Sequence, residues 1–354
     1  MIEPNGYFFG AQEITGSSLV VGPPDAENQV YDAGDAPYAL GDEVWRAGHV
    51  FRSLIDANSD DTAVALSWDD LGEVDKGALL WTAGTYAENV FKVLSGRVWK
   101  SAKASNTTTP GDTSTPELAD DWTDAGPTNR FKAFDLKSNL PALLDGEITW
   151  VFETPWTINT MLLVLPRGGR AFITVTDTLG EEVFDEEYRL TRDSGGGPYN
   201  HDFSPIDSVS RLIVFGLPPG TGNTVKVRIT GSAGQLVGTG QIAMGFSYDL
   251  GTVVVGSSTG VSSFKDAVED EFGNVVFPDR PVRRVVRFKL VGPIRNNDNT
   301  LTRVAQYLNK PAGMFMTDGV DYGLCAFGLV QEVELPMDNS VLTDATIEMK
   351  GFAE

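Results

Sequence analysis

Apolar and polar residues alternate along several stretches between residues 129 and 255. In Thr224–Thr230 every second residue is apolar, so an extended chain places Val225, Val227 and Ile229 on one face and polar residues on the other. The same pattern recurs in three other segments: Ala171–Thr176, Arg211–Phe215 and Gly240–Tyr248. Turns rich in glycine and proline separate these segments, so a β-sandwich is predicted over residues 129–255.

The pattern is different over residues 256–354. Apolar side chains recur there at helical spacing: Leu301, Val304, Ala305 and Leu308. Asn299 is a suitable N-cap and Pro311 follows the end, so an α-helix is predicted over residues 299–310. Strands are predicted before and after it, at Arg283–Leu290, Gly313–Thr317, Leu324–Leu335 and Ala345–Phe352. This β-α-β-β-β order predicts a small α+β domain.

A short pattern occurs twice in the first third of the chain. Each copy has a glycine turn, an apolar and aromatic pair, a basic residue and a serine, and closes with W-x-D-x-G. The copies are Gly48–Ser53 with Trp68–Gly72, and Gly96–Ser101 with Trp122–Gly126. This layout predicts two small β modules built around tryptophan, at residues 37–84 and 85–128. Residues 1–36 are predicted to form a leader with one strand at residues 18–21.

Aromatic residues are concentrated in these modules. A domain this small needs a tryptophan in its core, and we assign Trp68 and Trp122 to that role. Exposed flat rings can instead bind the apolar face of a sugar while neighbouring amides and carboxylates contact its hydroxyls. The candidates for an exposed glycan-binding platform are Tyr38, Trp45, Trp81 and Tyr86. For each of these taken singly, a place in the core is the alternative.

The composition limits the classes of partner. The 354 residues are 41% hydrophobic and 21% charged, which indicates several folded domains rather than a disordered chain. The formal net charge of −22 repels phosphate backbones, so nucleic acid is not expected as a partner, and a solvated acidic surface is the simplest interpretation. No apolar stretch reaches membrane-spanning length and the first residues show no secretory signal, so neither membrane insertion nor a signal peptide is expected.

Residues for catalysis or metal binding are few. Cys325 is the only cysteine, which argues against a disulfide framework and favours assembly in a reducing cytoplasm; its apolar neighbours predict a buried side chain. Arg97 replaces His49 in the second copy, which argues against an essential proton shuttle, and His201 is expected in an exposed loop. The segment Asp56–Asp61 begins like a calcium loop but lacks its later glycine and glutamate. No enzymatic activity, cofactor or metal site is therefore predicted.

The strand at residues 283–290 is strongly basic in this acidic chain. In extended form Arg283, Arg287 and Lys289 project to one side of it. They are candidates for an assembly interface, at an edge that docks onto another copy of the chain or an acidic partner. Pairing within the chain, with Glu269, Asp270 and Glu271, is an alternative of equal weight, and nucleic-acid binding comes third.

Two resemblances follow from these motifs. The first module, from Tyr38 through Gly48–Ser53 to Trp68, resembles the small chitin- or cellulose-binding modules of secreted glycosidases, whose pattern is Y-x-x-G-D-x-V, G-x-x-Y/F and a closing tryptophan. Most of the chain resembles structural tail proteins of tailed bacteriophages that carry such modules ahead of a β-sandwich. The segments that carry this second resemblance are Gly126–Asp135, Asp270–Asn274 and Ala345–Phe352.

The resemblance implies a virion component at the tail tip, baseplate or fibre attachment, assembled in the host cytoplasm in several copies. Its expected partners are other tail proteins, further copies of the chain as a homo-oligomer, and a host cell-surface glycan bound by the modules. One alternative is a structural adaptor whose modules contact only neighbouring proteins. A second is a glycan-degrading accessory enzyme, because a chain with this many acidic residues always offers some pair of carboxylates.

Overall fold

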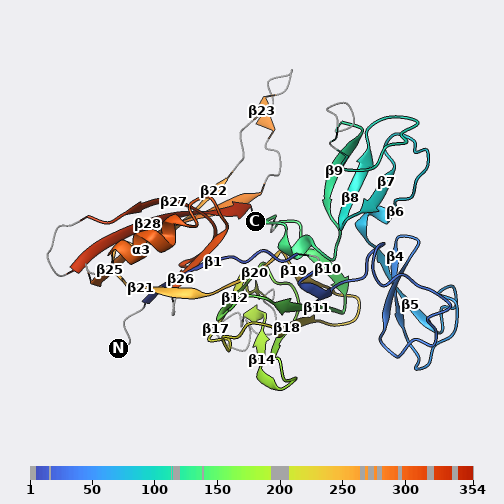
Figure 1. The fold of residues 1–354 in the computed structure, drawn as a ribbon, viewed down its shortest axis with the longest axis horizontal. Coiled ribbons are helices and arrows are strands. Elements are labelled where there is room, and N and C mark those ends of the chain that lie inside the picture. Colours follow the sequence, from blue (N-terminus) through green and yellow to red (C-terminus); the bar gives the residue numbers. More distant parts are fainter. Residues whose placement is uncertain are drawn as a thin grey trace.

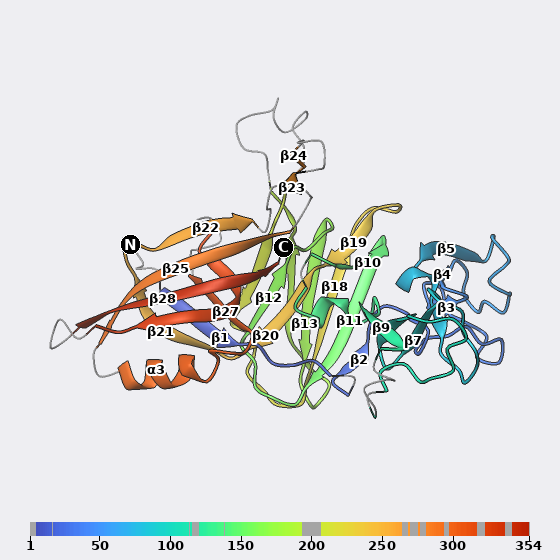
Figure 2. The same ribbon diagram turned by 90° about the horizontal axis from the view of Figure 1, so that it is seen from above.

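The computed structural model describes residues 5–15, 17–112, 114, 120–137, 139–192, 207–263, 268–269, 275–276, 281–293, 297–316, 323–336 and 342–353. This part of the chain is mainly β, with several separate sheets and one α-helix, which confirms the predicted mainly-β, multidomain fold. Three parts follow one another along the molecule (Figure 1): the two small modules, a sandwich, and a sheet that closes on itself beside the helix. Figure 2 shows the same order from above.

Each module is a small sheet built on a tight hairpin. The first contains β3 (Glu43–Arg46), β4 (His49–Ser53) and β5 (Trp68–Glu73), and the second contains β6 (Leu79–Leu80), β7 (Phe91–Leu94), β8 (Arg97–Ser101) and β9 (Trp122–Pro127). The hairpin turns are Ala47-Gly48 and Ser95-Gly96, and all four residues have positive φ. Two-residue turns of this kind match the twist of the flanking strands, which explains the glycine at the start of each repeat. A 3₁₀ turn at Asp75–Gly77 follows the first module.

The sandwich has a large sheet facing smaller ones. The large sheet has the order β14 (Glu182–Arg189), β13 (Arg170–Thr176), β18 (Asn223–Thr230), β11 (Glu147–Thr154) and β2 (Leu19–Val21). The smaller ones are β17 (Arg211–Phe215), β12 (Thr160–Val164) and β20 (Gln241–Gly245), and the pair β10 (Ala142–Asp145) and β19 (Leu236–Thr239). A short pair, β15 (Thr191–Arg192) and β16 (Asp207–Ser208), forms a separate two-stranded sheet. Val225, Val227 and Ile229 are fully buried while Lys226 is exposed, so the predicted alternation is confirmed.

The last part is a sheet of seven strands in the order β21 (Ser247–Val253), β1 (Asn5–Gly10), β26 (Ala312–Met316), β27 (Cys325–Glu334), β28 (Leu342–Ala353), β25 (Val282–Pro293) and β22 (Ser258–Ser263). Because β21 also pairs with β25, through Thr252 opposite Val291, the sheet closes on itself and β22 is added outside the ring. The pair β23 (Val268–Glu269) and β24 (Val275–Val276) follows β22 in the chain. Fully buried side chains fill the inside of the closed sheet: Phe8, Phe288, Met314, Ile347 and Met349.

The helix α3 (Asn297–Ala305) lies against the closed sheet (Figure 2) and is shorter than predicted. Val304 is fully buried in the core of the closed sheet, and the ring of Tyr307 meets Phe8 edge to face at 5.8 Å. Leu301 and Leu308, which the periodicity assigned to the buried face, are 42% and 39% exposed. The helix ends at Ala305, although Tyr307 beyond its end still packs against the core.

The sandwich and the closed sheet share an apolar interface. Strand β1 is buried on both faces, since Phe8 points into the closed sheet and Phe9 points towards β12. Phe9 clusters there with Leu162, Phe315 and Phe327, and Cys325 belongs to the same cluster, which agrees with its predicted burial. An apolar contact of this kind resists relative motion of the two parts.

The domain boundaries differ from the predicted ones in three respects. The second module begins before the predicted residue 85, because β6 (Leu79–Leu80) pairs with β7. The other two differences concern the leader and the strand after the sandwich. The leader is not a separate unit, because β1 belongs to the closed sheet and β2 pairs with β11 in the sandwich. The predicted strand at Gly240–Tyr248 is broken at Phe246 into β20 and β21, and β21 pairs with β1 and β25 rather than within the sandwich. Long-range pairing decides these last two points, and a local pattern contains no information about it.

Candidate functional site

The first module is organised around a buried asparagine. Asn58 is fully buried and exchanges two backbone hydrogen bonds with Tyr38. Its side-chain amide donates to Ser53 Oγ at 2.9 Å and to the carbonyl of Ser67 at 2.8 Å. This side chain therefore ties three segments of the module together. It lies within the calcium-like segment, whose Asp60 carboxylate accepts a hydrogen bond from the Ser67 hydroxyl.

The second module repeats this frame around Asn106, which is also fully buried. The partners of Asn106 are the backbone of Tyr86, the hydroxyl of Ser101 and the carbonyl of Asp121. The two closing tryptophans are also bonded in equivalent ways. The indole N–H of Trp68 donates to the carbonyl of Asp60, and that of Trp122 donates to the carbonyl of Thr108. Both tryptophans are at most 4% exposed, in keeping with the core role assigned to them. Motif comparison missed the asparagines, although each follows its serine by five residues.

The two candidate tyrosines are structural. Tyr38 accepts a hydrogen bond from the backbone N–H of Asp32 at 2.9 Å and donates to the carbonyl of the same residue at 2.7 Å, and its ring packs on Trp68. Tyr86 bonds to both backbone groups of Thr82 in the same way, and Lys92 covers its ring at 4.9 Å. Both hydroxyls and much of both rings are used inside the modules, so neither tyrosine presents the open platform that was predicted.

The two candidate tryptophans do not form a platform either. Trp45 is only 6% exposed and packs in the core, so its assignment to an exposed surface is wrong. Its backbone pairs with residues 29–31 of the leader, which covers the strand. Trp81 is half-buried at the start of the second module, where its backbone N–H donates to the carbonyl of Val93. The four candidates therefore lie in two separate modules and do not come together as one surface.

A different aromatic face lies on β4 of the first module. His49 and Phe51 are two residues apart on the strand, and their rings lie side by side with centroids 6.3 Å apart and planes 29° apart. They line a shallow pocket of 410 Å³. Polar groups surround it: His49 Nδ1 lies 3.1 Å from Asp70, and Arg46 Nη1 lies 2.6 Å from Asp61. The four polar side chains are each 40–51% exposed, so they remain accessible to a ligand.

The described residues of the second module include no matching pair of rings at this face. Arg97 replaces His49 and is paired with Asp124, as His49 is with Asp70. Trp99 replaces Phe51, but its indole N–H donates to the carbonyl of Leu94, and the loop at Gly111 lies against the ring. The same backbone frame thus carries a two-ring face in one copy and a single covered ring in the other.

A buried polar joint connects the modules to the sandwich. It is built by the segment Gly126–Asp135 together with Asp25 and Asp75. Thr128 Oγ1 donates to Asp25 at 2.9 Å, and the backbone N–H of Asn129 donates to Asp75 at 2.6 Å. The five residues of this joint, Asp25, Asp75, Thr128, Asn129 and Arg130, are at most 6% exposed. Burial raises the pKa of Asp75 to about 6.

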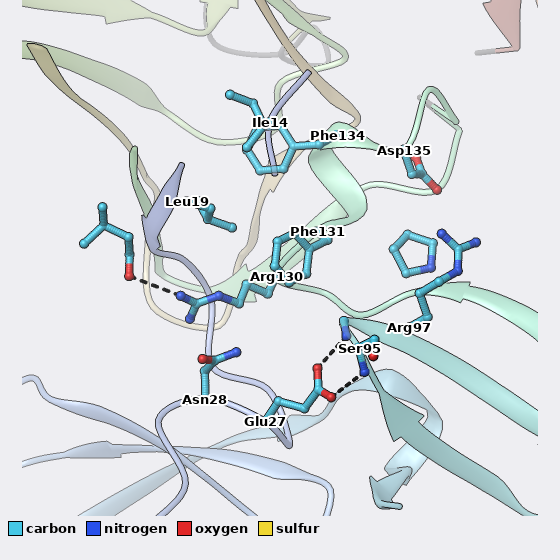
Figure 3. Close-up of a pocket in the computed structure, with 13 residues that line it drawn as sticks. Ile14, Leu19, Glu27, Asn28, Ser95, Arg97, Arg130, Phe131, Phe134 and Asp135 are labelled. Carbon is cyan, nitrogen blue, oxygen red and sulfur yellow. Dashed lines mark hydrogen bonds between the residues drawn. The ribbon is translucent and has the colours of Figure 1, made fainter. Parts of the chain in front are cut away.

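A cleft of 730 Å³ opens beside this joint (Figure 3). Phe131 and Phe134 form its apolar wall, while Glu27 binds the backbone N–H groups of Ser95 and Gly96 at the hairpin turn of the second module. Arg130 donates to the carbonyl of Val20 at 3.2 Å. Because Glu27 and Arg130 already form hydrogen bonds within the chain, we assign the cleft to the contact between the second module and the sandwich and not to ligand binding.

The basic strand β25 is not an edge. It pairs with β28 on one side and with β22 on the other, so the predicted docking edge is wrong. The alternation itself is confirmed from Val286 to Leu290, since Arg287 is exposed and Lys289 half-buried while Val286, Phe288 and Leu290 are buried. Arg283 donates to Ser262 of β22 at 3.1 Å. Of the alternative partners predicted for this strand, Asp270 and Glu271 lie outside the described residues, and so does the side chain of Glu269. Residues 272–274 and His201 lie outside them as well.

Two further findings concern the described residues alone. They contain no group of three His, Cys, Asp or Glu side chains placed to hold a metal ion. No helix among them has the length and apolar character to cross a membrane.

No protein-family profile, curated protein or solved structure matches the chain.

Proposed function

We propose that this chain is a non-enzymatic structural protein of a bacteriophage tail and that its first module binds a neutral host-surface glycan. The tail assignment is supported by the sequence resemblance and by the build of the molecule. Its closed sheet and its sandwich are joined by an apolar cluster and form one body. The modules lie at the end of the molecule opposite the closed sheet (Figure 1). This arrangement suits a protein that assembles through one part and presents another, and several linked copies would add avidity to weak binding.

The glycan assignment depends on one observation, the paired rings of His49 and Phe51 on β4. Adjacent rings 29° from parallel offer a nearly continuous surface for the apolar face of a sugar chain. Asp61, Asp70 and Arg46 around the rings provide acceptors and donors for hydroxyl groups. Since the frame does not require these residues, as the second module shows, the face is a property of this copy alone.

The charge of the first module selects the class of sugar. Residues 37–73 contain eight Asp and Glu against two Arg, Arg46 and Arg52, and both arginines are ion-paired with acids of the module. An anionic sugar such as a uronate meets net repulsion there. The favoured ligand is a neutral hexose or N-acetylhexosamine chain.

Isothermal titration of the full chain with three probes tests the glycan assignment: cellotetraose, chitotetraose and tetragalacturonate. At least one neutral probe is expected to bind with a Kd of about 1 mM or lower, and tetragalacturonate is expected not to bind. Phe51→Ala should weaken binding about tenfold, the loss of roughly 1.4 kcal/mol of ring contact. Arg97→Ala, at the position of His49 in the second module, is the matched control and should change nothing. If no neutral sugar binds, the glycan assignment is excluded and the alternative of a structural adaptor, whose modules contact only neighbouring proteins, is favoured.

Mass spectrometry of purified phage particles tests the tail assignment separately. Peptides of this chain are expected in particles at several copies each. Their absence from particles that are otherwise complete would contradict the assignment whatever the titrations show.

A further inference from the structure

One end of the sheet in the first module carries four exposed aliphatic side chains. The backbone N–H of Gly41 donates to the carbonyl of Ser53, and that of Leu54 donates to the carbonyl of Ser67. These bonds bring three chain segments together where β4 ends. The side chains they gather, called here the apolar end, are Leu40, Leu54, Ile55 and Leu66, which are 65%, 44%, 41% and 88% exposed.

The second module shows that the fold does not need these residues. Its backbone makes the equivalent bonds, from Asn89 to Ser101 and from Ala102 to Asp121. The residues in the corresponding positions are Glu88, Ala102, Lys103 and Asp120. All four are exposed, and Lys103 forms an ion pair with Asp121 at 2.6 Å. The same backbone frame thus carries mainly polar side chains at this end in the second module and aliphatic side chains in the first.

An exposed group of large aliphatic side chains at one place marks an interaction site rather than a requirement of folding. Leu66 retains 88% of its accessible surface and Leu40 retains 65%, so burial against a partner would remove most of that surface from water. The apolar end is also separate from the glycan pocket, whose lining contains none of its four residues.

Charge around the apolar end selects the partner. Asp42 lies two residues after Leu40, and its carboxylate accepts a hydrogen bond from the backbone N–H of Ala39. Asp56 directly follows Ile55. Asp60 bonds to Ser67, next to Leu66. A symmetric contact between two copies would bring these acids face to face. A surface with lysine or arginine around its apolar centre would pair with them instead.

We propose that the apolar end of the first module docks a different protein, one that presents an apolar surface ringed by basic side chains. This inference does not depend on glycan binding. It gives the first module two faces, a polar aromatic one for a ligand and an aliphatic one for a protein neighbour.

The test uses two amphipathic peptides with the same leucines, one flanked by lysines and one by glutamates. Fluorescence anisotropy with the full chain should show binding of the lysine peptide and at least about tenfold weaker binding of the glutamate peptide. Leu66→Asp and, independently, Leu40→Glu install the residues of the second module, so both should fold normally by circular dichroism. Each substitution should weaken binding of the lysine peptide at least about fivefold.

The sign of this change separates the proposal from general charge attraction. Both substitutions add negative charge, so non-specific attraction of a basic peptide would become stronger, not weaker. Leu179→Asp is the matched control, because Leu179 is 85% exposed in the turn before β14 and lies outside the module. Three results would overturn the proposal: equal binding of the two peptides, unchanged binding by both variants, or self-association in sedimentation velocity that Leu66→Asp abolishes.

Discussion

The buried carboxyl group of Asp75 should make the joint between the modules and the sandwich sensitive to pH. Asp75 is 4% exposed, and one of its oxygens accepts a hydrogen bond from the N–H of Asn129. The other oxygen has no hydrogen-bond partner among the residues that the structure describes. Burial is the main cause of its raised pKa, which the charge of Asp25 raises further, while Lys132 and the N–H of Asn129 oppose it. Asp75→Asn keeps an acceptor for Asn129 and removes the buried charge.

The size of the effect follows from the pKa of the carboxyl group. Below pH 3.8 the group is protonated in both the folded and the unfolded chain. Between pH 3.8 and about 6 the folded chain keeps a proton that the unfolded chain loses, so the free energy of unfolding falls as pH rises. Above about pH 6 the loss is complete and amounts to roughly 3 kcal/mol, at about 1.36 kcal/mol per pH unit.

Urea unfolding followed by tryptophan fluorescence measures this loss. The free energy of unfolding of Asp75→Asn minus that of the wild type should rise by roughly 3 kcal/mol between about pH 3 and about pH 7.5. Any pH-independent effect of the amide cancels in this comparison. Asp69→Asn, at an exposed position of β5, is the control and should give a flat difference. A flat difference for Asp75→Asn would refute the burial argument for this joint.

Three further predictions concern the frame and the interface. Asn58→Ala and Asn106→Ala should each lower the free energy of unfolding by about 2–3 kcal/mol, since two buried partners lose their bonds; a loss below about 0.5 kcal/mol in urea titrations would contradict the frame. Tyr38→Phe should lower the free energy of unfolding by about 1 kcal/mol, because the hydroxyl loses its hydrogen bonds to Asp32. Sugar binding in the titrations should stay unchanged; weaker binding would show that Tyr38 contacts the ligand. Phe9→Ala should lower the free energy of unfolding by about 3–5 kcal/mol and make the chain easier to cleave by protease between the sandwich and the closed sheet. An unchanged digestion pattern would argue against a rigid interface.

Local patterns were sufficient for most strands. The two-residue alternation in β18 and β25 reports directly which side chains meet a core, because successive residues of a strand face opposite ways. The paired glycines at Gly48 and Gly96 likewise mark tight turns whose positive φ favours that residue. The duplicated motif therefore marked the hairpin at the centre of each module, although not the boundary between them, since β6 (Leu79–Leu80) pairs with β7.

Features that depend on distant segments could not be predicted in this way. The closure of the last sheet requires β1, β21 and β25 to meet, and their residues are far apart in sequence. Tyr38 and Trp45 were assigned to the surface because the leader that covers or bonds them has no recognisable pattern of its own. One local signal was available and missed, the serine-to-asparagine spacing of five residues in both modules, at Ser53 to Asn58 and Ser101 to Asn106.

The location of the chain on phage particles tests the central claim most directly. Electron microscopy of particles labelled with a gold-conjugated antibody fragment against residues 37–128 would show where the modules lie. The proposed function predicts label at the tail tip, baseplate or fibre attachment, with several gold particles per tail. Label on the capsid, or none on intact particles that bind the fragment after disruption, would contradict the claim of a tail protein that presents its modules outward.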